Sequence, residues 1–271
     1  MRRIALATGV ELAVQEYGDG TPVLLLHAWG ETHRVFDRLV PLLLDTLHLI
    51  VPDQRGVGES SKPPDGYGLF DAVDDVVALL DEMGVDACWI AGTSSGGYVA
   101  QQVALSHPER VSGLVLIGAP SNLQRRSPDF LVQQLSLFHD PVTRDDIHTL
   151  NGVLPLHASV PETYLEDQVI AALTIPTHVW RAGLEGLIAA EPPIQRGSIT
   201  IPTLILWGEE DDVLPAEQGA ELAAAIEGSH LVTYEGTGHL VLVEQPERVA
   251  EDVISFIAGL PDPVRNGTRT V

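Results

Sequence analysis

The stretch IAGTSSGGYVAQQVAL, residues 90–105, passes from apolar residues through six small residues into a helical pattern. Residues 92–96 read Gly-Thr-Ser-Ser-Gly, which fits G-x-S-x-G only with Ser94 as the central serine. An abrupt turn from strand to helix strains the backbone at its corner, and glycines two positions away allow the close approach. The stretch therefore predicts a turn that exposes the Ser94 hydroxyl group above a sheet and places the Ser95 N–H group at a helix N-terminus.

Eight strand-like segments run along the chain, and the central ones are nearly continuous in Val, Ile and Leu. Such runs suit strands buried on both faces of a parallel sheet. The segments begin at residues 4, 11, 23, 48, 87, 113, 203 and 230. Helical patterns lie between them, at residues 35–45, 69–84, 96–107, 216–228 and 246–260. This alternation predicts a doubly wound, mostly parallel eight-stranded α/β sheet, with the first two strands forming an antiparallel hairpin at one edge.

The alternation stops between residues 121 and 198, where amphipathic fragments are interrupted by seven prolines. We expect a helical cap there, because an insertion after a central strand covers the crevice in which open α/β sheets bind ligands. The expected organisation is a core of residues 1–120 and 199–260, a cap or lid of residues 121–198, and a C-terminal tail of residues 261–271 with little to bury.

The composition narrows the range of partners. The chain has 271 residues, and 38 Asp and Glu against 15 Lys and Arg give a net charge of −23. This charge repels phosphate backbones and anionic membranes, so we expect neither nucleic acid nor a membrane as a partner. No apolar run approaches roughly 18 residues and no secretory pattern begins the chain, which indicates a cytoplasmic protein. The single Cys88 offers neither a disulfide framework nor a cysteine metal cluster, and the sequence does not indicate an oligomeric state.

A nucleophilic serine needs a base that accepts its proton and an acid that orients the base. Of the ten histidines, His239 lies in a Gly-rich loop after the last strand, at the end of the sheet where Ser94 is expected. Four carboxylates, residues 209–212, follow a central strand, and only one of them can point inward to the imidazole. We choose Asp211, with Asp212 as the alternative.

Ser94, Asp211 and His239, in this chain order and on this strand and helix pattern, resemble the α/β-hydrolase superfamily. The likeness covers nearly the whole chain, through the segments LLLHAWGETHRVFDRLVPLL, IVPDQRGVGESSKP, GTSSGGYVAQQVALSHPERVSGLVLIG, LWGEEDDVLP and GTGHLVLVEQPERV. These look like the small single-cap branch, which contains esterases, enol-lactonases, cofactor-free haloperoxidases and carbon–carbon bond hydrolases. By this resemblance Asp211 matches the family's acid, since it lies three residues after Gly208 and four before Pro215.

The resemblance also implies an oxyanion hole made by two backbone N–H groups. The family's loop after the first central strand reads His-Gly-x, and the N–H group of x is one donor. Residues 27–29 read His-Ala-Trp here, so the implied donors are Trp29 and Ser95. Ala28 stands where the family usually has glycine, and its methyl group restricts the backbone of this loop.

These residues predict acyl transfer to water. Ser94 attacks a carbonyl group, His239 accepts its proton, Asp211 stabilises the imidazolium ion, and the two N–H groups hold the oxyanion. The expected partner is a small-molecule substrate, a small and neutral carboxylic ester or lactone, because the net negative charge disfavours an anion. No metal or organic cofactor is expected. The residues predicted to form the substrate pocket are Trp29, Phe130, Phe138 and Trp180.

Other functions are compatible with the same residues. In relatives of this branch the triad hydrolyses carbon–carbon bonds or, with peroxide and a carboxylic acid, forms peracids. Other proteins with this fold are slow or non-catalytic ligand receptors. An anionic substrate would be favoured if arginines of the insertion pointed into the pocket; these are Arg125, Arg126, Arg181 and Arg196.

Overall fold

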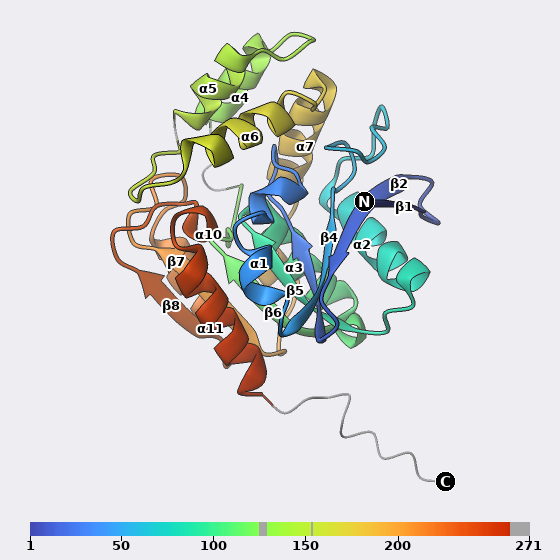
Figure 1. The fold of residues 1–271 in the computed structure, drawn as a ribbon, viewed down its shortest axis with the longest axis vertical. Helices are drawn as coiled ribbons and strands as arrows, with labels where there is room; N and C mark the ends of the chain where they lie inside the picture. Colours follow the sequence, from blue (N-terminus) through green and yellow to red (C-terminus); the bar gives the residue numbers. More distant parts are fainter. Residues whose placement is uncertain (125–128, 153, 261–271) are drawn as a thin grey trace.

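The computed structural model describes residues 1–124, 129–152 and 154–260; the expected tail, Arg125 and Arg126 lie outside this range. An eight-stranded sheet runs through the molecule in the order β1-β2-β4-β3-β5-β6-β7-β8 (Figure 1). β1 pairs antiparallel with β2 and β2 with β4, and all other neighbours are parallel. The predicted mostly parallel sheet is therefore confirmed. The strands are β1 (Arg2–Ala5), β2 (Glu11–Tyr17), β3 (Thr21–Leu26), β4 (Leu47–Pro52), β5 (Cys88–Thr93), β6 (Val111–Ile117), β7 (Thr203–Gly208) and β8 (His230–Tyr234).

Helices cover both faces of the sheet, because successive strand residues point to opposite sides and both sides are apolar. On one face α2, α3 and α9 pack over Leu24 and Ile90, and on the other α1, α10 and α11 pack over Leu25 and Leu49. These helices are α1 (Val40–Leu43), α2 (Leu69–Met83), α3 (Ser95–Ser106), α9 (Glu217–Ala225), α10 (Val241–Glu244) and α11 (Pro246–Ala258).

The helix expected over residues 35–45 is shorter than predicted. The chain forms a 3₁₀ turn, η1 (His33–Phe36), and then the single helical turn α1, which has Pro41 in its first turn. Proline has no N–H group to donate to the carbonyl four residues earlier, and its ring collides with that carbonyl, so a continuous helix cannot pass through this position. A second 3₁₀ turn, η2 (Pro108–Arg110), precedes β6.

The segment between β6 and β7 contains five helices and, among its described residues, no strand. In Figure 1, α4 and α5 lie farthest from the sheet, and α6 and α7 lie between them and the core. The helices enclose an apolar cluster that includes Phe138, Ile147 and Trp180. We call residues 129–196 the cap. Its helices are α4 (Asp129–Leu137), α5 (Arg144–Asn151), α6 (Glu162–Ala172), α7 (Thr177–Ala189) and α8 (Pro193–Arg196).

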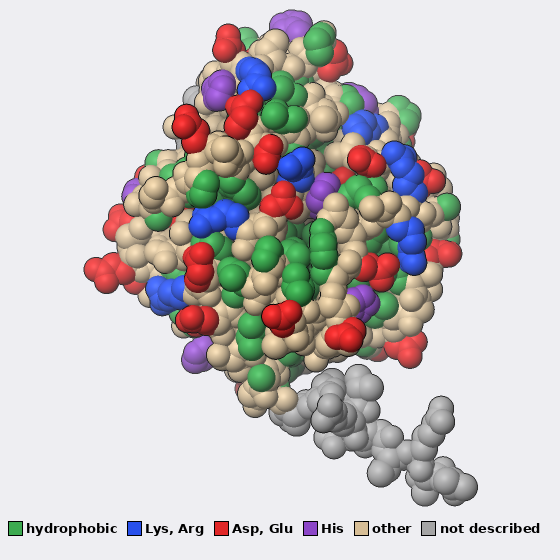
Figure 2. Space-filling view, viewed as in Figure 1, with side chains coloured by type: hydrophobic (Ala, Val, Ile, Leu, Met, Phe, Trp, Pro, Cys, Tyr) green, Lys and Arg blue, Asp and Glu red, His purple; other side chains and the backbone are tan. Residues whose placement is uncertain are grey.

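The described residues contain no candidate membrane span and no candidate metal-binding group, and their one thiol is buried. Acidic side chains are scattered over the face in Figure 2, with Lys and Arg between them. Within the described ranges no helix is long and apolar enough to cross a membrane, and no three His, Cys, Asp or Glu residues are placed to hold a metal ion. Burial raises the pKa of the Cys88 thiol to about 12, which keeps it protonated and unreactive.

The turn between β5 and α3 brings three backbone segments into direct contact. Ser94 has φ 45° and ψ −120°, and it is the one residue other than glycine with positive φ in the described chain. A Cβ atom at Gly96 would lie 2.2 Å from the carbonyl oxygen of Leu26 in β3, and one at Gly92 would lie 2.4 Å from the backbone of Gly96. The glycines on either side of the turn therefore allow β3, β5 and α3 to meet behind Ser94.

We expect Gly96→Ala to lower the free energy of unfolding by about 3 kcal/mol or more, because its methyl group would overlap backbone atoms of a central strand. Gly152→Ala is the control, since its φ of −63° suits alanine and its nearest neighbours lie 3.4 Å away. Urea titrations of both variants measure the difference. Equal stabilities would contradict the close approach.

Candidate active site

Ser94, Asp211 and His239 meet at the carboxyl ends of β5, β7 and β8. His239 Nε2 lies 3.0 Å from Ser94 Oγ, and His239 Nδ1 lies 2.8 Å from Asp211 Oδ2. The side chains of His239 and Asp211 are only 5% and 1% exposed. When Nδ1 donates to the carboxylate, Nε2 is left as the acceptor that faces the serine hydroxyl group. The three residues selected from the sequence are thus joined by hydrogen bonds in the order Ser94, His239 and Asp211.

The carboxylate that reaches the imidazole is that of Asp211, and its loop holds it in place. Asp211 Oδ1 accepts the N–H groups of Val213 and Leu214, both at 2.9 Å, which leaves Oδ2 for His239. Asp212, the alternative, is exposed to solvent. A side chain that bonds its own loop in this way has little rotational freedom, so it fixes the orientation of the ring.

The loop that carries His239 is fixed by Glu244, which the sequence analysis did not single out. This buried side chain in α10 accepts the Gly238 N–H group at 2.9 Å, through Oε1. Its Oε2 accepts the N–H groups of His157 and Ala158 at 2.8 and 2.9 Å. One carboxylate therefore ties the histidine loop to the cap. Its only sequence signal was an acid directly after three apolar residues in VLVEQP.

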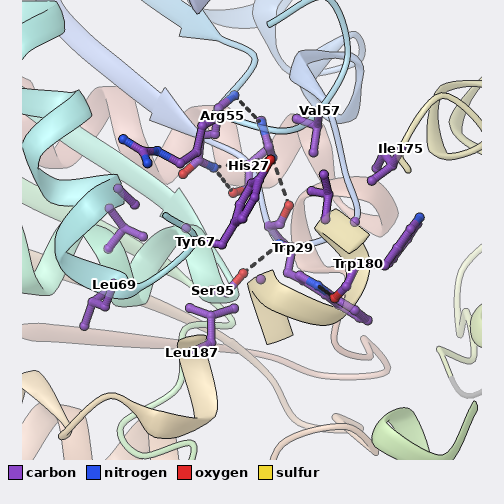
Figure 3. A pocket seen from close by; sticks show the side chains of 18 of the residues that line it. His27, Trp29, Arg55, Val57, Tyr67, Leu69, Ser95, Ile175, Trp180 and Leu187 are labelled. Atoms are coloured by element: carbon purple, nitrogen blue, oxygen red, sulfur yellow. Dashed lines mark hydrogen bonds between the residues drawn. The ribbon is translucent and has the colours of Figure 1, made fainter. Parts of the chain in front are cut away.

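The loop after β3 places Trp29 beside Ser95, the other residue expected to supply an oxyanion N–H group. Trp29 N donates to Ser95 Oγ at 2.7 Å, a bond visible in Figure 3. A tight turn shapes the loop, because Ala28 N donates to Glu31 Oε2 at 2.8 Å and Glu31 N donates to Ala28 O at 3.2 Å. The left-handed residue of this turn is Gly30, with φ 80°, so the side chain of Ala28 is accommodated without strain.

Helix α7 of the cap packs directly on this loop. Trp29 Nε1 donates to the carbonyl oxygen of Trp180 at 2.9 Å, and the two indole rings meet edge to face with centroids 4.9 Å apart. A Cβ atom at Gly30 would lie 2.3 Å from the Trp180 ring. The position of the cap and the conformation of residues 28–31 therefore depend on each other.

Comparison with known proteins now identifies the family. The family model of the alpha/beta hydrolase fold matches residues 21–246, most of the chain. The chain belongs to this family. The fold expected from the G-x-S-x-G motif and from the alternation of strands and helices is thereby confirmed.

Relatives within this hydrolase family carry several activities in their names. The 2-hydroxymuconate semialdehyde hydrolase of Pseudomonas sp. (strain CF600) is 28% identical over 94% of this chain and 93% of its own length. The pimeloyl-[acyl-carrier protein] methyl ester esterase of Yersinia enterocolitica is 28% identical over 86% of this chain and 92% of its own. The structure of a thermophilic esterase from Thermogutta terrifontis has a TM-score of 0.82 at 25% identity, covering 96% of this chain and 99% of that one. Hydrolase is the activity class that they share.

A cavity of about 90 Å³ opens between residues 27–30, α2 and α7 of this hydrolase (Figure 3). Its lining is mostly apolar and includes Trp29 and Ser95, but neither Ser94 nor His239. The cavity therefore lies beside the three hydrogen-bonded residues and does not contain them. The cavity is the space behind the expected oxyanion position, where a group attached to the carbonyl carbon can lie.

The predicted pocket residues have different positions. Trp29 and Trp180 line the cavity. Phe138 does not line it; this side chain is buried in the cap with its ring 5.9 Å from that of Trp180, because an amphipathic helix end needs apolar residues to pack the cap itself. The side chain of Phe130 lies outside the described residues.

Arg55 of the cavity wall and the described arginines of the cap already have hydrogen-bond or ion-pair partners. Arg55 lines the cavity, but its Nε and one terminal nitrogen each donate to Asp75 at 2.6 Å, and both side chains are nearly buried. Arg181 donates to two carbonyl groups at the end of α4. Arg196 pairs with Glu191 at 3.0 Å. Arg181 and Arg196 do not line the cavity, and the charge of Arg55, which does, is paired with Asp75.

Glu31 is a half-buried carboxyl group near His239. Burial raises its pKa from 4.5 to about 7, while the hydrogen bond from Ala28 and the neighbouring His239 act in the opposite direction. The native protein therefore binds this proton more tightly than the unfolded chain does. Ionisation of Glu31 lowers native stability as the pH rises from 4.5 through 7, and below that range the group has no effect.

Glu31→Gln keeps an oxygen for the Ala28 N–H group and removes the charge. Relative to the wild type, we expect this variant to gain about 2 kcal/mol of unfolding free energy between pH 5 and pH 8, after allowance for the part of the side chain that water reaches. Urea titrations at the two pH values measure this. A constant difference between the two proteins would show that Glu31 does not titrate in this range.

Proposed function

We propose that this hydrolase cleaves a small, neutral carboxylic ester or lactone through an acyl-enzyme on Ser94. The observation that carries the proposal is the continuous chain of hydrogen bonds from Asp211 through His239 to Ser94 Oγ. An imidazole held at Nδ1 by a buried carboxylate accepts a proton at Nε2, and this makes the serine oxygen a nucleophile.

In the acylation step, Ser94 Oγ forms a bond to the carbonyl carbon, its proton passes to His239 Nε2, and the carbonyl π electrons move to the oxygen. The Asp211 carboxylate stabilises the imidazolium ion. The N–H groups of Ser95 and Trp29 are the oxyanion donors expected from the sequence. His239 then protonates the leaving alcohol as the C–O bond breaks, and a water molecule attacks by the same route to release the acid.

The cavity and its charges support a small, neutral substrate. Its volume of about 90 Å³ is below the roughly 150 Å³ of a cavity that holds benzene, so a short aliphatic group suits it better than an aromatic ring. The one arginine in its wall, Arg55, already pairs with Asp75 through two hydrogen bonds. A substrate carboxylate placed there would lose its hydration without gaining an unpaired cation.

Carbon–carbon bond hydrolysis is the second candidate, because the same triad serves it in relatives of this branch. The observation in its favour is the 28% identity to a 2-hydroxymuconate semialdehyde hydrolase over 94% of this chain. The substrate in that name carries a carboxylate, however, and Arg55, Arg181 and Arg196 are occupied by other groups. We therefore place a neutral ester or lactone first. Ligand binding without turnover is separated from it by the first of the two experiments that follow.

The roles of the triad are tested by three variants assayed with p-nitrophenyl butyrate. We expect Ser94→Ala and Asp211→Asn to lower kcat by roughly 10⁴-fold or more, because they remove the nucleophile and the group that fixes the imidazole tautomer. Asp212→Asn is the matched control, since its exposed carboxylate neighbours Asp211 without reaching His239, and its kcat should stay within about threefold of the wild type. Equal losses in both aspartate variants would contradict the assignment of the acid.

The preference for a neutral substrate is tested with dimethyl succinate and monomethyl succinate, which differ by one charge and one methyl group. We expect kcat/KM to be at least about tenfold higher for the diester, because an unpaired carboxylate is repelled by the protein's field. Acid release in a pH-stat measures both rates. A preference for the monoester would overturn the neutral assignment and favour the carbon–carbon candidate.

A further inference from the structure

The hydroxyl group of Ser95 occupies an unexpected place in the site. Its oxygen accepts the Trp29 N–H group at 2.7 Å, although that N–H group is the one expected to hold the oxyanion. Ser95 is 8% exposed and lines the cavity. The described residues offer no acceptor for the Ser95 O–H hydrogen. The Ser95 O–H group is therefore an unused donor at the wall of the cavity, next in the chain to Ser94.

The backbone N–H group is a second donor of the same residue. Ser95 is the first residue of α3, and the first N–H groups of a helix have no partner within it. Two donors of one residue, N–H and O–H, are thus available beside the nucleophile. Because the hydroxyl oxygen already accepts a bond from Trp29, its own hydrogen becomes a stronger donor.

The loop does not release the Trp29 N–H group easily. Glu31 holds its turn, Trp29 Nε1 is bonded to the Trp180 carbonyl oxygen, and the Trp180 ring lies against Gly30. Turning the Trp29 N–H group away from Ser95 would disturb all three contacts. We therefore expect the hydrogen bond from Trp29 N–H to the Ser95 oxygen to persist, because breaking it would require the loop to change its shape.

We propose that the Ser95 hydroxyl group is a catalytic residue, a side-chain donor of the oxyanion hole. In this arrangement the oxyanion receives hydrogen bonds from Ser95 N–H and Ser95 O–H, and Trp29 N–H acts through the hydroxyl group rather than directly on the substrate. No bond to the Ser95 hydrogen breaks in the cycle. This inference rests on the proposed acyl transfer at Ser94.

Ser95→Ala tests it. We expect kcat for p-nitrophenyl butyrate to fall about tenfold to a hundredfold with KM within about twofold, because an oxyanion donor acts in the transition state and not in the ground state. Ser106→Ala is the matched control: its hydroxyl group lies at the other end of α3, where it accepts a bond from Gln102. The control should keep the wild-type kcat. Unchanged or faster turnover in Ser95→Ala would overturn the proposal and show that the hydroxyl group only occupies or blocks the hole.

A second measurement separates catalysis from structure. Ser94 Oγ adds to the carbonyl carbon of a butyl trifluoromethyl ketone, and the carbonyl oxygen becomes the hemiketal oxyanion in the hole. We expect Ser95→Ala to lose affinity for this ketone by the same factor as kcat/KM, while affinity for the unreactive butyl methyl ketone is unchanged. A loss of kcat without a matching loss of ketone affinity would assign Ser95 a structural role and overturn the proposal.

Different results would overturn the proposed function and the role of the Ser95 hydroxyl group. Turnover that persists in Ser94→Ala would remove the proposed function itself. An inactive Ser94→Ala variant beside a fully active Ser95→Ala variant would leave the proposed function intact and overturn only the role of the Ser95 hydroxyl group.

Discussion

The backbone of Ser94 has a conformation that residues other than glycine rarely adopt, and the rest of the site is arranged around it. Its φ of 45° and ψ of −120° cost about 1 to 3 kcal/mol, which the surrounding packing must offset. Ser94 N donates to Ile117 O at 2.8 Å, and the carbonyl group of Ser94 accepts from Gly97 in the first turn of α3. Behind it, Gly96 lies against β3. This corner directs the side chain of Ser94 to His239 and leaves the N–H group of Ser95 free at the helix start.

Three loops complete the site, and a carboxylate orders each of them. Loops need acceptors for backbone N–H groups that no strand or helix satisfies, and a carboxylate accepts several at once. The acidic side chains on the face in Figure 2 are spread over the surface, and three carboxyl groups hold the loops of this site. They are Glu31 in the loop after β3, Asp211 in the loop after β7 and Glu244 beside the loop after β8.

The fold and the triad were predictable because their signals are local. The G-x-S-x-G motif and the continuous apolar runs each lie in a short segment with a distinct pattern. Ser94, Asp211 and His239 lie in or directly after such segments, in a recognisable chain order. Contacts between distant segments were not predictable. An acid among apolar residues, such as Glu244, looks like an ordinary amphipathic position until the loop that it bonds is placed. The hydrogen bond from Trp29 to Ser95 joins residues 66 positions apart. The position of Phe138 also depends on distant segments, because only the packed helices of the cap decide which apolar side chains line the cavity and which lie inside the cap.

The assignment of Ser94 as the nucleophile is tested most directly by labelling with a fluorophosphonate probe, followed by mass mapping of the modified peptide. The phosphorus atom forms a bond to an activated serine oxygen and fluoride leaves, so the label marks the nucleophile itself. We expect one label, on Ser94, and none on this peptide in Ser94→Ala. A label on another serine, or ester cleavage that continues in an unlabelled protein, would contradict it.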